Sequence, residues 1–150
     1  MRGMTILGIL LATVTWAGAQ TLDQTEAWRP MHAFIGTWKG VRASGKVTRT
    51  YASAPTNHHL EITEKAGGPA GVWGIVSYDT AKSQLVLRQF GTDGSATEVA
   101  LDPAASNADQ LVFAGGETRI TYRREGWNAF TERVERGAAL VSETRFQRKD

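Results

Sequence analysis

Residues 118–147 read TRITYRREGWNAFTERVERGAALVSETRFQ, and this stretch decides the fold class of the chain. Its runs rich in Ile, Thr, Tyr, Phe and Val are separated by Gly126-Trp127-Asn128 and by Gly137. In each run apolar residues alternate with polar ones, which is typical of half-buried strands joined by tight turns. The stretch therefore predicts three consecutive antiparallel strands, because such short connections leave no room for a crossover helix.

The same pattern extends back to Gly36 and predicts ten strands in all. The expected strands are Thr37–Ala43, Lys46–Ala52, His59–Glu64, Gly71–Tyr78, Gln84–Phe90, Ala96–Leu101, Gln110–Ala114, Thr118–Glu125, Ala129–Arg136 and Ala139–Gln147. A meander of this size exposes two long edges unless it closes on itself. We therefore predict an all-β, antiparallel up-and-down barrel over residues 36–150. A short helix near Glu26–Phe34, within an N-terminal segment 20–35, is expected to precede it.

The first residues resemble a secretory signal peptide. Arg2 precedes the apolar run Met4–Val14, and Ala17-Gly18-Ala19 supplies small residues of the A-x-A type. The run is shorter than the roughly 20 residues of a membrane-spanning helix. We expect cleavage after Ala19, a secreted or periplasmic mature protein and no membrane span in the mature form. The alternative is an uncleaved N-terminal anchor.

The composition excludes several classes of protein. The 150 residues include 41% hydrophobic residues, 17 Lys and Arg against 15 Asp and Glu, and no Cys. The hydrophobic content is too high for a disordered chain, and a net charge of +2 is too small for a nucleic-acid coat. Without Cys there is no disulfide, no thiolate nucleophile and no cysteine zinc cluster.

Charged residues interrupt the apolar faces of several expected strands. Arg49, Arg88, Arg124 and Glu132 each share an alternating face with Val, Ile, Tyr or Phe. Because an unpaired buried charge costs several kcal/mol, the four cannot all lie in a dry, filled core. One interpretation is a wet interior that binds an amphipathic molecule. The other is that the charges pair across strands on the outer surface.

The first interpretation defines a candidate site for a small hydrophobic or amphipathic ligand. Its aromatic residues would form the wall, and its charged residues would hold a polar group. The candidate ligand-binding residues are Arg49, Tyr51, His58, Trp73, Arg88, Phe90, Phe113, Tyr122, Phe130 and Glu132.

The residues give little support for metal or catalytic chemistry. His58 and His59 are adjacent, so on a strand they point to opposite faces and do not chelate one metal together. One histidine, His32 included, could bind haem iron singly. No G-x-S-x-G motif is present, and we assign no catalytic residue and no metal ligand. Two alternatives to a ligand carrier remain: a structural or interaction module with a filled core, and a haem-binding barrel or isomerase-like cavity enzyme.

Two short motifs resemble the signature of the calycin superfamily, which includes lipocalins, fatty-acid-binding proteins and nitrobindin-like haem barrels. Phe34–Gly40 places a G-x-W motif at the start of the first strand, and Thr144–Phe146 places a basic residue in the last. The resemblance implies that Trp38 closes one end of the barrel and that Arg145 stacks across it, with Arg148 as a substitute. It also implies a ligand site inside the barrel.

The stretches Gly74–Asp79 and Leu87–Gly94 are further similar to secreted lipocalin-like domains. The resemblance does not extend to the ligand-binding residues of two subfamilies. The last three strands lack the histidine that binds haem in nitrobindin-like proteins, and the last strand lacks the Arg-x-Tyr pair of fatty-acid-binding proteins. Arg49-Thr50-Tyr51 has that pair in the second strand instead.

Overall fold

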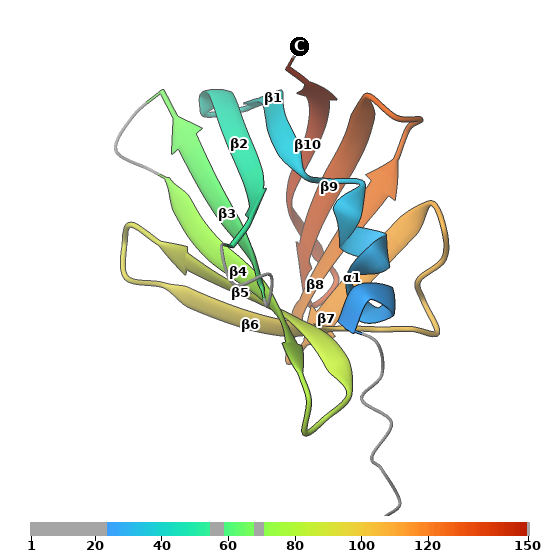
Figure 1. Cartoon of the computed structure of the whole chain (residues 1–150). Coiled ribbons are helices and arrows are strands. Elements are labelled where there is room, and N and C mark those ends of the chain that lie inside the picture. Colours follow the sequence, from blue (N-terminus) through green and yellow to red (C-terminus); the bar gives the residue numbers. More distant parts are fainter. Residues whose placement is uncertain (1–23, 55–58, 68–70, 150) are drawn as a thin grey trace, which may run out of the picture.

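The computed structural model describes residues 24–54, 59–67 and 71–149. These residues form one short helix and ten antiparallel strands that close into a barrel (Figure 1). Each strand pairs with its neighbours in sequence, and the first strand pairs with the last. The predicted all-β barrel of ten strands is therefore confirmed. The expected signal peptide, residues 1–19, lies outside the described residues.

The elements follow the predicted ones closely. They are α1 (Gln24–His32), β1 (Gly36–Arg42), β2 (Gly45–Ser53), β3 (His59–Ala66), β4 (Val72–Asp79), β5 (Gln84–Gly91), β6 (Ala96–Leu101), β7 (Gln110–Gly115), β8 (Thr118–Arg124), β9 (Ala129–Arg136) and β10 (Ala139–Arg148). Turn chemistry explains why the boundaries fall where the sequence predicts them. Gly137, between β9 and β10, has a φ of +58°, a left-handed conformation that glycine adopts without steric cost.

The helix α1 closes the end of the barrel at which β1 begins. Its buried Trp28 and Met31, with Phe34 from the linker, belong to the main hydrophobic core. The Phe34 ring lies among the rings of Tyr51, Tyr122 and Phe130, at centroid distances of 5.9, 5.6 and 5.1 Å. Side chains from the N-terminal segment thus occupy the middle of the barrel.

Trp38, the tryptophan of the G-x-W motif, lies on the inner face of β1 beside Phe34 and Phe130. Its ring is buried, and its Nε1 donates a hydrogen bond to the Phe34 carbonyl at 2.7 Å. The guanidinium over the ring is that of Arg148, 4.3 Å from the ring, and not that of Arg145. The register explains this correction, since Trp38 pairs directly with Arg148 while Arg145 lies on the outer face and binds Glu125 at 2.6 Å. Arg148 also donates to the carbonyls of Ala33 and Ile35.

Candidate functional site

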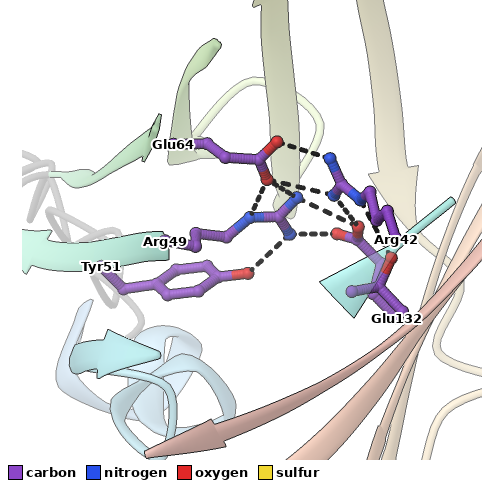
Figure 2. A network of polar contacts seen from close by, with 6 residues as sticks. Arg42, Arg49, Tyr51, Glu64 and Glu132 are labelled. Carbon is purple, nitrogen blue, oxygen red and sulfur yellow. Dashed lines mark hydrogen bonds and ion pairs between the residues drawn. The ribbon is translucent and has the colours of Figure 1, made fainter. Parts of the chain in front are cut away.

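Four charged side chains meet inside the barrel and form what we call the buried ion cluster: Arg42, Arg49, Glu64 and Glu132 (Figure 2). They come from β1, β2, β3 and β9. The side chains of Arg49, Glu64 and Glu132 are 2–3% exposed, whereas Arg42 is 22% exposed and is the member that reaches solvent. The cluster contains two cations and two anions, so it is electrically neutral.

Alternation along each strand places these residues in the interior. Arg49 lies between the buried Val47 and Tyr51 on the inner face of β2. Glu64 continues the inner face of β3 after Leu60 and Ile62. On β9 and β1 the same alternation turns Glu132 and Arg42 inward. The cluster therefore follows from the period-2 pattern once the inner face of each strand is known.

Arg49 is the centre of the cluster. Its Nε donates to Glu64 Oε2 at 2.8 Å and its Nη2 to Glu132 Oε1 at 3.0 Å. Its Nη1 donates to the second oxygen of Glu132 and to the Tyr51 hydroxyl. The guanidinium also lies 4.8 Å from the Phe146 ring centroid. All three nitrogens of Arg49 thus have an acceptor, which is the condition for burying this charge.

Arg42 covers the cluster at its more exposed side. Its Nη1 donates to Glu64 Oε1 at 2.5 Å, and its Nη2 donates to Glu132 Oε1 at 3.2 Å. Its Nε donates to Thr144 Oγ1 at 2.9 Å. Each carboxylate therefore receives hydrogen bonds from both arginines, and Arg42 links β1 to β3, β9 and β10.

Burial and charge pairing set the ionisation of these groups. Burial acts to raise the pKa of Glu132, but the charge of Arg49 and its hydrogen bonds outweigh it, so the pKa is lowered. Burial acts to lower the pKa of Arg49, and the charge of Glu132 keeps it above its ordinary range. Burial raises the pKa of Tyr51 to about 12 and that of Tyr122 well above its usual value. At neutral pH Arg49 and Glu132 are therefore ionised, and both phenols are neutral.

A pH series should reveal the ionised Glu132. Because its pKa is lowered in the folded state, its stabilising effect is complete above the ordinary glutamate pKa of 4.5 and is lost as the pH falls through the folded value. We expect the difference in free energy of unfolding between wild type and Glu132→Gln to be largest near about pH 7 and to shrink in acid. Denaturant titrations across that range measure it. A Glu98→Gln control on the exposed surface should show little difference at any pH, and a constant Glu132→Gln difference would contradict the assignment.

One polar atom of this region lacks a partner. The Tyr122 hydroxyl is buried and has no partner at full hydrogen-bond geometry among the described residues, although the Glu132 carboxylate lies close enough to add to the rise in its pKa that burial causes. The Tyr122 ring packs against Phe34 and lies 6.0 Å from Phe113, in an edge-to-face arrangement. A buried hydroxyl without a hydrogen-bond partner lowers the stability of the folded state. A small polar molecule bound beside Tyr122 could supply the missing partner.

The structure brings six of the ten candidate ligand-binding residues together inside the barrel. These six are Arg49, Tyr51, Phe113, Tyr122, Phe130 and Glu132. Trp73, Arg88 and Phe90 instead lie on the outer face of β4 and β5, where Trp73 stacks on Phe90 at 5.3 Å and Arg88 binds Glu98 at 2.8 Å. Their predicted interior position is wrong. His58 lies outside the described residues.

The error on β5 has a simple physical cause. Leu85, Val86 and Leu87 are consecutive apolar residues, and all three are buried. Both faces of β5 are therefore apolar here, and the alternation of apolar and polar residues does not identify the inner one. Leu85 and Leu87 belong to the main core, which turns Val86, Arg88 and Phe90 outward. Arg124 was also expected on the inner face. It lies at the end of β8 instead, and its side chain donates to the Ala108 carbonyl at an exposed position.

The sequence interpretation also missed Arg42 and Glu64. Both were detectable, because each continues an alternating series of interior residues, Trp38 and Gly40 on β1 and Leu60 and Ile62 on β3. Extending each series to the end of its strand would have identified the partners of Arg49 and Glu132.

The described residues offer no group of three or more His, Cys, Asp or Glu side chains that could hold a metal ion. His32 is exposed at the end of α1, and His59 lies 3.6 Å from Glu61 on the outer side of β3. Within the described part of the chain, no helix is long and apolar enough to cross a membrane.

Two clefts of small-molecule size are lined by described residues outside the aromatic core, besides a smaller one of about 110 Å³. One, of about 570 Å³, is lined by residues of β1, β2 and β10. The other, of about 550 Å³, is lined by α1, the loop between β6 and β7, and Arg124. Both volumes are in the range of small-molecule sites.

Comparison of the chain with protein-family models and with curated proteins gives no match.

Proposed function

We propose that this chain is an exported, calycin-like barrel with a filled interior that acts as a binding module through its outer surface. Two features support the calycin-like assignment: the closed ten-strand meander, and the Trp38–Arg148 pair at the end covered by α1. The signal-peptide pattern of residues 1–19 supports export, which N-terminal sequencing of the purified protein would test.

The observation that carries the proposal is the occupied centre of the barrel. Phe34 fills the space between the aromatic rings of the opposite walls, and the neutral ion cluster occupies the adjoining region. A ligand carrier keeps this volume for its ligand. In contrast, the outer surface exposes large apolar side chains: Ile35, Val41, Trp73, Phe90, Trp127, Leu140 and Val141.

Xenon binding followed by NMR tests whether the interior is filled. Xenon enters apolar cavities about the size of a deleted side chain. We expect no xenon-induced shifts at the ring signals of Tyr51, Tyr122 and Phe130 in the wild type, and clear shifts in a Phe34→Ala variant. Shifts at these rings in the wild type would contradict a filled interior, and this measurement stands even if the variant folds poorly.

A second candidate function is carriage of a small amphipathic molecule inside the barrel. The buried, unpartnered Tyr122 hydroxyl favours it, because a guest could accept its hydrogen bond while lying on the aromatic rings. Such a guest would have to displace Phe34. Native mass spectrometry of protein purified from its own envelope would show whether a small molecule co-purifies. A co-purifying molecule that changes the NMR chemical shifts of Tyr122 when it is added back would support this candidate over the first.

A further inference from the structure

We propose that the cleft over β1, β2 and β10 binds one anionic amphiphile, with its acidic head held by Lys39 and Lys46 and its aliphatic chain lying on Val41. We call it the basic cleft. This inference rests on the proposed function, because it names the ligand class for a barrel that binds on its outside. The side chains that define it are Lys39, Val41, Lys46, Thr48, Arg145 and Gln147.

The strand register gathers these side chains on one outer face. Lys39 pairs with Gln147 on β10 and with Thr48 on β2, so the three form a row across the sheet. Val41 pairs with Lys46 in the next outward row. The two lysines therefore lie on adjacent strands, diagonally across one face of the sheet, with Val41 beside them.

The two lysines of the basic cleft carry positive charge that no nearby carboxylate of the described chain neutralises. No carboxylate is among the residues that line it. Lys39 and Lys46 make no ion pair with any described residue, whereas Arg145 binds Glu125 at 2.6 Å. Glu143, the next outward residue on β10, lies 3.6 Å from Arg133, which partly neutralises it. Two ammonium groups thus remain available to an anion.

The apolar part of the cleft indicates an amphiphile and not a simple anion. Val41 is 68% exposed, so water covers most of this side chain in the unliganded protein. Covering it with a hydrocarbon chain is favourable, because apolar surface is removed from water. A volume of about 570 Å³ suits one small molecule. The net charge of +2 is too small for strong attraction of the whole chain to an anionic membrane surface, so we commit to a monomeric ligand.

An NMR-monitored titration with monomeric dodecyl phosphate, below its critical micelle concentration, tests the proposal on the full-length protein. We expect saturable shifts at Lys39, Val41 and Lys46. The double variant Lys39→Gln/Lys46→Gln should weaken binding about tenfold. The matched control Lys82→Gln, on the β4–β5 turn, should leave it unchanged. Val41→Ser should weaken binding of dodecyl phosphate more than that of inorganic phosphate.

Four outcomes would overturn the inference: no binding, binding that the double variant retains in full, equal affinity for inorganic phosphate and dodecyl phosphate, or binding only to phosphatidylglycerol vesicles. The last would indicate a membrane-docking surface. Failure of the filled-barrel proposal is distinguishable, because a ligand that entered the barrel would shift Tyr122 and Phe130 instead of the lysines.

Discussion

Replacement of Arg49 by methionine is expected to lower the free energy of unfolding by about 3–5 kcal/mol. Arg49 donates to both Glu64 and Glu132 from a fully buried position. Methionine occupies a similar volume but leaves the two carboxylates with only Arg42 to compensate them. The loss of stability therefore comes more from the uncompensated buried negative charge than from the lost hydrogen bonds. Chemical denaturation at neutral pH measures it.

The double variant Arg49→Met/Glu132→Leu is the informative control. It removes one cation and one anion together and leaves Arg42 with Glu64, which is again a neutral pair. We expect the double variant to be more stable than Arg49→Met alone, because replacing a buried pair by apolar residues is often neutral or stabilising. Arg88→Met, on the outer surface, should change stability by less than about 0.5 kcal/mol. An Arg49→Met loss below about 1 kcal/mol would show that water reaches the cluster.

Replacement of Trp38 by alanine should cost a similar amount, about 3–5 kcal/mol. The ring is buried at the α1 end of the barrel and packs edge-on against Phe130 at 4.9 Å. Its removal leaves a cavity, breaks the bond to the Phe34 carbonyl and removes the platform under Arg148. Thermal and denaturant unfolding measure the loss.

Trp127 provides the matched control, because it is 71% exposed on the turn between β8 and β9. Trp127→Ala should cost less than about 0.5 kcal/mol. If Trp38→Ala cost as little as Trp127→Ala, then the indole would not be a closing element of the barrel, and the calycin-like assignment would lose one of its two supports.

Local sequence pattern was sufficient for the strands because hydrogen-bonded β structure needs only an extended run and a turn at each end. β6 and β9 begin and end where alternation and turn residues predict them. Local pattern was insufficient where side chains interact with more than one neighbour. On β10 a bulge between Leu140 and Ser142 shifts the register, so Leu140 is exposed although it shares a parity with the buried Phe146.

The candidate site was predicted in part for the same reason. Arg49 and Glu132 stood out because each interrupts an apolar series, but Glu64 is 15 residues from Arg49 and Glu132 is 83 residues from it. Glu64 is the cross-strand partner of Arg49 on the neighbouring strand β3, whereas β9 does not pair with β2, so only closure of the barrel brings Glu132 to Arg49. Similarly, Arg145 and Arg148 are both basic residues of the last strand, and only the pairing of Trp38 with Arg148 selects between them.

By itself, the sequence determined that this chain folds into ten antiparallel strands, because alternation and turn chemistry are properties of neighbouring residues. Only the tertiary structure decided the inner face of strands with apolar residues on both faces, such as β5, and what fills the interior. Closure of the sheet sets the direction of every side chain, and the register between distant strands brings two arginines and two glutamates within hydrogen-bond distance. Phe34 fills the barrel because the helix before β1 folds back over its end, a long-range contact that no local pattern encodes.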